Sequence, residues 1–334
     1  MKRKLTILSG CIAAMALSCL LLSWGRWGHE HINRAAVFAL PAGMRPFFYN
    51  HIDYITVEAS IPDSRRSIIN DKAEPNRHFI DLENYLTHPG DSMPQTLKEA
   101  TDKYDAKFIE SNGILPWYIE EMTGKLTNAF RNRHKAEILF IAADLAHYIG
   151  DAHMPLHTSA NYDGQMTNQR GVHSFWESQL PEMFGNSYNF CTGDAVYIPD
   201  VHNEIRRMIA HTHSLIDSLL AAEKTARASL PEDKLYEKDA SGNPRRNQYN
   251  QTYRTKEYAA AFHQALNGMV ERQMRLSVAD VANFWYTAWV NAGQPDLIGL
   301  DPEALTDRNS KSLKKDYKLW RKGKLFGFKS DNEF

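Results

Sequence analysis

Hydrophobic residues recur along most of the chain at spacings of three and four, which is the period of an amphipathic helix. In the segment His29–Leu40, for example, Ile32, Ala35, Ala36 and Leu40 share one face, and Pro41 ends the pattern. The sequence contains no series of alternating strands, no glycine-rich phosphate loop and no internal repeat. We therefore expect an all-α fold. The same periodicity predicts five further helical stretches, at Arg45–Ala59, Leu115–Phe130, His134–Ala152, Asp200–Ala226 and Lys256–Ala292.

Two polar stretches, 158–170 and 237–254, interrupt this pattern without a change of composition on either side. One compact multi-helix domain over residues 24–300 is the simplest interpretation, followed by a basic C-terminal tail over 301–334. Between Arg308 and Lys329 the tail has nine Lys or Arg residues and one acid, Asp316, interleaved with aromatic residues. We expect a solvated tail, with binding to nucleic acid or to an anionic membrane surface as the alternatives.

The first 23 residues have the pattern of a secretory signal peptide. Lys2, Arg3 and Lys4 precede an apolar run from Leu5 to Leu22, and the small residue Ser23 follows. A permanent membrane anchor is the alternative, and Cys11 lies in a lipoprotein-like box. We expect an exported protein, periplasmic or secreted, with a lipoprotein or membrane-anchored form as the variant. Cleavage after Ser23 leaves Cys191 as the only cysteine, so no intrachain disulfide can form.

Histidines and carboxylates recur at the spacing of metal ligands. His147 and Asp151 are four residues apart, so one face of a helix presents both side chains to one ion. Pro155 should end that helix, so that His157 returns toward the same side. Sixteen residues later, His173 and Glu177 form a second pair with the same spacing. A single such pair is usually a surface salt bridge, whereas two pairs linked by a third histidine offer the nitrogen and oxygen ligands that zinc takes.

Other residues complete a pattern with these pairs. Asp63 lies in an expected helix-terminal loop, in the segment Ser60-Ile-Pro-Asp-Ser-Arg-Arg66, and His78 follows fifteen residues later in His78-Phe-Ile-Asp81. The segment Trp24-Gly-Arg-Trp-Gly-His29 begins directly after the expected cleavage point. Together these motifs resemble the three-zinc nucleases (nuclease S-one/P-one type) of fungi, plants and bacteria, a family whose fold is shared by bacterial zinc-dependent phospholipases C.

The resemblance implies a site with three zinc ions. The first ion would be bound by Asp63, His78, His147 and Asp151, and the second by His157, His173 and Glu177. The third would be bound by His29, by Asp151 as a bridge, and by the amino nitrogen and carbonyl oxygen of Trp24, whose free amine exists only after cleavage. Asp63 would also act as a proton acceptor and Arg66 as a clamp on the phosphate.

The resemblance further implies hydrolysis of a phosphodiester, most simply of single-stranded nucleic acid to 5′-phosphorylated products. Phe79 and Asp81 match the family residues that stack on a base and hydrogen-bond its edge; core packing of Phe79 and turn capping by Asp81 are the alternatives. Glu177 replaces the Asp usual in the nucleases and matches the phospholipases. A phospholipase C and a catalytically weak zinc-binding protein therefore remain the alternative functions. The resemblance implies no protein partner. Two other conspicuous residues are not expected to bind metal: His153 should lie in the cleft or on the surface, and Trp285 in the core.

Overall fold

The helical periodicity of the sequence is realised in the computed structural model, which describes residues 25–86, 92–246 and 252–325. These residues contain no strand beyond isolated β-bridges in the polar segment 236–254. The predicted all-α fold is confirmed. The helices are α1 (Gly25–Ala39), α2 (Arg45–Asn50), α3 (Ile52–Glu58), α4 (Ile61–Ser67), α5 (Leu82–Tyr85), α6 (Leu97–Lys103), α7 (Ala106–Asn112), α8 (Leu115–Arg131), α9 (Lys135–Ala152), α10 (Val172–Ser174), α11 (Leu180–Phe184), α12 (Val201–His213), α13 (Ile216–Ala228), α14 (Lys256–Ala265), α15 (Met269–Asn291) and α16 (Glu303–Trp320).

All six predicted stretches are helical, but three of them are broken into two helices. The stretch from Arg45 breaks at His51, whose backbone leaves the helical region between α2 and α3. The stretch from Asp200 breaks between α12 and α13. The stretch from Lys256 breaks between α14 and α15, where Asn267 and Gly268 both have positive φ angles, 47° and 76°. Asn and Gly adopt that conformation most readily, so the dipeptide ends a helix that the hydrophobic period alone would continue.

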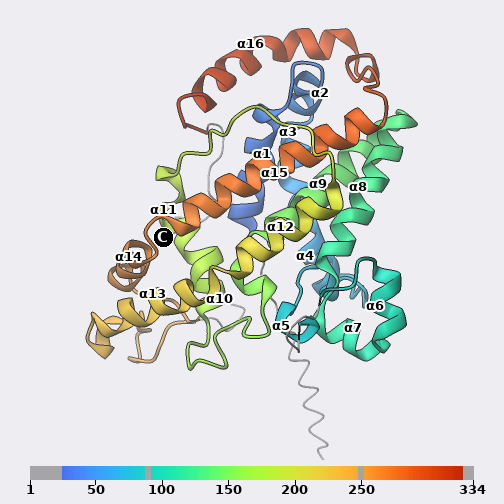
Figure 1. The fold of residues 1–334 in the computed structure, drawn as a ribbon. Coiled ribbons are helices and arrows are strands. Elements are labelled where there is room, and N and C mark those ends of the chain that lie inside the picture. Colours follow the sequence, from blue (N-terminus) through green and yellow to red (C-terminus); the bar gives the residue numbers. More distant parts are fainter. Residues whose placement is uncertain (1–24, 87–91, 247–251, 326–334) are drawn as a thin grey trace, which may run out of the picture.

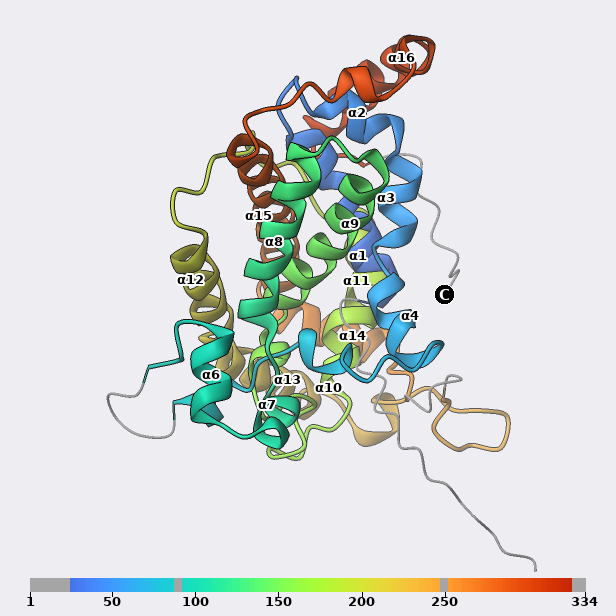
Figure 2. The same cartoon turned by 90° about the vertical axis from the view of Figure 1, so that its right-hand side faces the viewer.

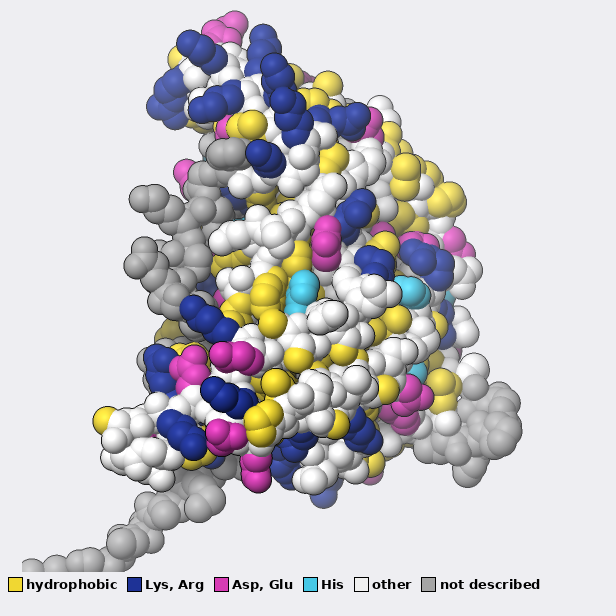
Figure 3. Space-filling view, turned by 90° about the vertical axis from the view of Figure 1, so that its left-hand side faces the viewer, with side chains coloured by type: hydrophobic (Ala, Val, Ile, Leu, Met, Phe, Trp, Pro, Cys, Tyr) yellow, Lys and Arg dark blue, Asp and Glu magenta, His cyan; other side chains and the backbone are white. Residues whose placement is uncertain are grey.

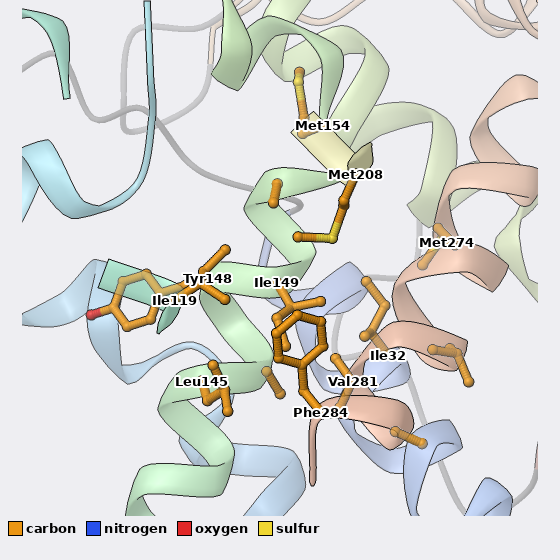
Figure 4. Packing of buried hydrophobic residues seen from close by; sticks show 14 of the residues in the cluster. Ile32, Ile119, Leu145, Tyr148, Ile149, Met154, Met208, Met274, Val281 and Phe284 are labelled. Carbon is orange, nitrogen blue, oxygen red and sulfur yellow. The ribbon is translucent and has the colours of Figure 1, made fainter. Parts of the chain in front are cut away.

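Helix α9 lies at the centre of the molecule, surrounded by α1, α3, α8 and α15 (Figures 1 and 2). Its residue Ile149 lies beside Ile32 of α1 and Val281 and Phe284 of α15 in the core, and Leu145 belongs to the same buried cluster (Figure 4). Small residues at 142, 143, 146, 150 and 152 are fully buried along α9 and let its neighbours approach closely. As a consequence, the polar side chains in its last two turns are buried too.

The two ends of this bundle differ. One end has the short elements α4, α5 and α10 around the end of α9, and the other has α2 covered by α16 (Figures 1 and 2). Residues 303–320 of the basic segment therefore form a helix, and Trp320 is 1% exposed, which differs from the solvated tail expected from sequence. An apolar side of this segment, around Trp320, packs on the bundle.

None of the described helices is long and apolar enough to cross a membrane. The predicted signal peptide, residues 1–23, lies outside the described residues, and the boundaries of the domain and of the tail stay predictions.

Candidate metal centre

The last two turns of α9 present a histidine and a carboxylate to the same point. His147 Nε2 lies 3.4 Å from Asp151 Oδ2, as their spacing in a helix requires. His78, which follows a short 3-10 turn, brings its Nδ1 to 3.0 Å from the same Asp151 oxygen and 3.1 Å from His147 Nε2. All three side chains are fully buried. Asp63 joins them, with its Oδ1 3.8 Å from His78 Nδ1. Four predicted ligands from three separate segments of the chain therefore converge at this point.

Asp63 lies in the first turn of α4, directly after Pro62, and not in a loop as expected. Proline is compatible with the first turn because its missing N–H would have no partner there. Helix α4 is held on α9 by Arg65, whose guanidinium donates to both oxygens of Asp144 at 2.6 and 2.8 Å. Such a bidentate pair fixes orientation as well as distance, so it places Asp63 against the end of α9.

His29 approaches the other oxygen of Asp151. Its Nε2 lies 3.5 Å from Asp151 Oδ1, and its ring stacks on that of His147 with centroids 3.9 Å apart. Asp151 therefore has one oxygen toward His29 and the other toward His78 and His147. This is the geometry that a bridging carboxylate requires.

A second group of ligand atoms lies beside the first. Glu177 Oε1 is 3.2 Å from His173 Nε2, and Oε2 is 3.6 Å from His157 Nε2. His173 is in α10 and Glu177 in the π-helical turn that follows it, Phe175–Gln179. Such turns are rare and are frequent at functional sites. The two groups are joined through the backbone, because His157 Nδ1 hydrogen-bonds the carbonyl oxygen of His78 at 2.6 Å.

Backbone carbonyls determine which nitrogen faces the ligand group in three of the five histidines. Nδ1 hydrogen-bonds a carbonyl oxygen in His147 (Ala59, 2.7 Å), in His157, and in His173 (Tyr162, 2.6 Å). Because a carbonyl can only accept, Nδ1 carries the proton, and in a neutral ring Nε2 presents a lone pair.

In the second group these lone pairs face the oxygens of Glu177, which also only accept. Within the described chain, both Glu177 oxygens and the Nε2 atoms of His157 and His173 are buried without a hydrogen bond. Buried acceptors that face one another need a cation between them, either a proton or a metal ion.

In the metal-free protein, protons meet this requirement. Burial lowers the pKa of His173, but the carboxylate of Glu177 outweighs it and raises the pKa to about 9. Burial likewise opposes protonation of His78, yet hydrogen bonds to Asp151 and Glu74 raise its pKa to about 9. For Asp63, burial dominates and raises the pKa to about 6 despite nearby His78 and Arg66.

The geometry brings together eight of the nine predicted ligands, in three sets whose ligand atoms lie within 4.8 Å of one another. The sets contain imidazole nitrogens and carboxylate oxygens and no thiolate, which is a donor set that zinc takes. They are His29, His147 and Asp151; Asp63, His78 and His147; and His157, His173 and Glu177.

The sequence profile of the S1/P1 nuclease family matches residues 24–283, which include all nine predicted ligands. The chain belongs to the S1/P1 nuclease family. The resemblance read from the motifs is therefore confirmed.

Among solved structures, the fold is similar to that of the alpha-toxin of Clostridium perfringens from avian strain SWCP, at 12% identity and a TM-score of 0.46. The match covers 82% of this chain and 66% of the toxin, slightly under two thirds of its length. Comparison with curated proteins finds no match.

The remaining residues of the S1/P1 motifs lie around these groups. Arg66 Nη2 is 3.6 Å from Asp63 Oδ1. Phe79 is half-buried and is not part of the buried hydrophobic core that the described residues form. Asp81 is 9% exposed, and burial, with a smaller contribution from Glu83, raises its pKa to about 7. Trp24 lies outside the described residues, so its part in this S1/P1 site stays a prediction.

Glu74 was not found from the sequence. It is fully buried and lies 3.2 Å from His78 Nε2, the nitrogen that faces away from the ligand groups. Tyr148 and Arg77 also donate to its carboxylate. A carboxylate behind a metal-binding histidine fixes its ring and raises its basicity. The spacing of four between Glu74 and His78 was the available clue.

His153 is buried and not in the cleft or on the surface as expected. Its Nε2 lies 2.9 Å from Asp280 Oδ2, which links the end of α9 to α15. Its ring is not in any of the three ligand sets. Trp285 is fully buried, as expected, and stacks on Phe48 with centroids 4.9 Å apart.

Proposed function

We propose that this member of the S1/P1 nuclease family is a zinc-dependent phosphodiesterase that hydrolyses single-stranded nucleic acid to 5′-phosphorylated products. The observation that supports it most directly is the pair of adjacent ligand groups, in the second of which buried acceptor atoms face one another. Three zinc ions would occupy the sets, with Asp151 between two of them and Trp24 completing the third.

Zinc in these sets would lower the pKa of a water molecule and polarise a phosphoryl oxygen. The protein supplies the rest of the chemistry. Asp63 can orient the attacking water and accept its proton, because its carboxylate is held at the edge of the first ligand group. The Arg66 guanidinium beside it would bind the phosphate as charge develops there. Attack is in line, without a covalent intermediate on the protein.

Phe79 and Asp81 would select the substrate. The Phe79 ring is half-buried and directly follows the ligand His78, so a base stacked on it would be held next to the reacting phosphate. Stacking of this kind contributes about 1–3 kcal/mol per base. We further propose that the enzyme works outside the cytoplasm, since the residues before Trp24 have the pattern of a signal peptide.

Hydrolysis of single-stranded DNA and of phosphatidylcholine by the purified mature protein, measured side by side, tests the substrate class. We expect cleavage of the DNA, with 5′-phosphate ends, and none of the lipid. Cleavage of the lipid alone would replace this proposal by the phospholipase C alternative. If the zinc-loaded protein hydrolyses neither substrate, the alternative of a catalytically weak zinc-binding protein would replace this proposal.

Variants separate the roles of the residues. Phe79→Ala should impair hydrolysis of a dinucleotide more than hydrolysis of a small aryl phosphodiester, which has no base to stack. Asp151→Asn should reduce activity and zinc content more than Glu177→Gln, because Asp151 faces two ligand sets and Glu177 one. If Phe79→Ala impairs hydrolysis of both substrates equally, Phe79 does not contact a base. If Asp151→Asn and Glu177→Gln have equal effects, Asp151 does not bridge two ions.

A further inference from the structure

Helix α16 lies beyond the part of the chain that matches the family profile, which ends at residue 283. We infer that its outer face is an accessory binding surface for the phosphate backbone of single-stranded nucleic acid, apart from the metal centre. The substrate class rests on the proposed function.

The inner face of α16 is fixed to the domain. Trp320 is buried, stacks on Phe38 of α1 and donates its indole N–H to the carbonyl oxygen of Phe190 at 3.1 Å. The guanidinium carbon of Arg45 lies over the ring of Tyr317, 4.1 Å from the ring centroid. The helix is therefore held in a defined orientation on α2, and its aromatic residues are not available to stack on bases or to enter a membrane.

The outer face carries the cations. The segment 308–324 has eight Lys or Arg residues and one acid, Asp316, which accepts a hydrogen bond from Tyr49 at 2.7 Å and so faces the domain. Figure 3 shows these blue side chains gathered over α16 at the top of the molecule. From 308 to the end of α16 at 320 they extend over about 18 Å of helix, and two more, at 321 and 322, lie in the turn that follows. The exposed cations of this stretch are Arg308, Lys311, Lys314, Lys315, Lys318, Arg321 and Lys322.

The rest of the chain has the opposite charge. The whole sequence has a net charge of −1 and this segment one of +7, so all other residues together carry −8. Three bound zinc ions would bring this charge to −2, so a polyanionic substrate is attracted to the basic helix rather than to the rest of the molecular surface. Nucleic acid phosphates are bound by such cations through charge alone, without sequence preference.

The arrangement favours nucleic acid over a membrane. A helix that lies on a bilayer inserts an apolar face, whereas the apolar residues of α16, such as Leu313 and Trp320, are packed on the core. Phe38, which contacts Trp320, is nine residues beyond His29 in α1, or about 14 Å along the helix axis. A dinucleotide in the metal centre is too short to span this distance, so only longer strands would contact both places.

The test compares a fourfold variant, Lys311→Gln, Lys314→Gln, Lys315→Gln and Lys318→Gln, with its charge-preserving counterpart carrying Arg at the same positions. Both keep exposed side chains on the helix, and circular dichroism checks that both fold. Binding of a fluorescent, nuclease-resistant 30-mer of single-stranded DNA is followed by anisotropy across a salt series. Steady-state hydrolysis of an ordinary 30-mer and of a dinucleotide is measured on the same zinc-loaded proteins.

At low salt, we expect the dissociation constant of the Gln variant for the 30-mer to be larger than that of the wild type by about tenfold or more, which is within the range of electrostatic effects on binding. Its slope of log K against log[salt] should be smaller by about 3 for four lost contacts. The kcat/KM for the 30-mer should fall while that for the dinucleotide is unchanged, and the Arg variant should behave as the wild type.

Unchanged binding and salt slope in the Gln variant would overturn the inference. The inference would also be overturned if the Gln variant lost binding to phosphatidylserine–phosphatidylcholine vesicles but still bound DNA as the wild type does, since α16 would then be a membrane-binding helix. The proposed function fails separately, if the wild type hydrolyses neither the 30-mer nor the dinucleotide, and the binding measurement still decides the role of α16.

Discussion

Glu74 shows how one side chain outside the ligand groups can control them. It holds His78 by Nε2, so the Nδ1 of that ring is the atom that meets Asp151 and His147. Its carboxylate also accepts hydrogen bonds from Tyr148 and Arg77. Burial opposes ionisation of Glu74, but the hydrogen bond and charge of His78, and then Tyr148 and Arg77, lower its pKa to about 2. A charged acceptor behind His78 favours the tautomer with a lone pair on Nδ1.

Glu74→Gln should therefore weaken zinc binding by about 10- to 100-fold, the usual effect of losing such a partner. Competition with a chromophoric chelator measures it without reference to activity. Glu223→Gln is the matched control, because Glu223 is also buried and hydrogen-bonded, to Tyr258 and Gln169, and belongs to none of the three ligand sets. Equal zinc affinity in the wild type and the Glu74 variant would show that the contact is merely structural.

Asp81 gives the molecule a dependence on pH. Its pKa in the folded protein is about 7, against 3.8 for the unperturbed group, chiefly because of burial. Between these values the folded protein keeps a proton that the unfolded chain releases. The free energy of unfolding therefore decreases as pH rises, by up to about 1.4 kcal/mol per pH unit.

Asp81→Asn keeps the shape and removes this titration, so we expect its stability to fall less than that of the wild type between pH 5 and pH 7.5. Urea unfolding at the two pH values measures the difference. Asp194→Asn, at an exposed carboxylate, controls for the lost charge. Parallel pH profiles for the wild type and the Asp81 variant would contradict the assigned burial.

At the scale of the elements, the turn between α7 and α8 supports the residue expected to contact a base. Gly113 ends α7 with φ +79°, and a Cβ there would lie 2.0 Å from the carbonyl oxygen of Phe79. The same Phe79 carbonyl accepts a hydrogen bond from Leu115 at the start of α8, at 3.2 Å. The position of Phe79 therefore depends on a close backbone approach that only glycine allows.

Gly113→Ala should destabilise the protein by more than about 1 kcal/mol and raise KM for a dinucleotide, because Phe79 must move. Gly124→Ala is the control, since a Cβ at Gly124, inside α8, meets nothing within 4 Å. That change should stabilise the helix by up to about 1 kcal/mol. Thermal unfolding and dinucleotide kinetics check both; a harmless Gly113→Ala would mean that the turn can shift freely.

At the scale of the whole molecule, the third predicted zinc depends on where the mature chain begins. The first described helix starts at Gly25, and His29 reaches Asp151 from its second turn. A free amine at Trp24 has an unperturbed pKa of about 7.7–8.0 and can lose its proton to zinc. An internal peptide nitrogen at the same position cannot do so without losing its amide proton.

One additional residue before Trp24 should therefore lower the zinc content from three toward two and reduce turnover. Metal analysis and intact mass of protein exported by its native host, compared with the extended form, measure this. Full zinc content and activity in the extended form would mean that the third site is built without the amine.

The sequence by itself determined the all-α class, the six helical stretches and the ligand motifs. Helical period and ligand spacing are local properties, and the His147–Asp151 and His173–Glu177 pairs each lie within one or two turns. The tertiary structure decided what depends on approach between distant segments. Only packing brings His29, Asp63 and His78 to the end of α9, places Tyr148 against Glu74, and buries Trp320 so that a basic segment becomes a helix with one charged face. These contacts join residues far apart in the chain, and no period or local motif encodes which distant surface will cover a side chain.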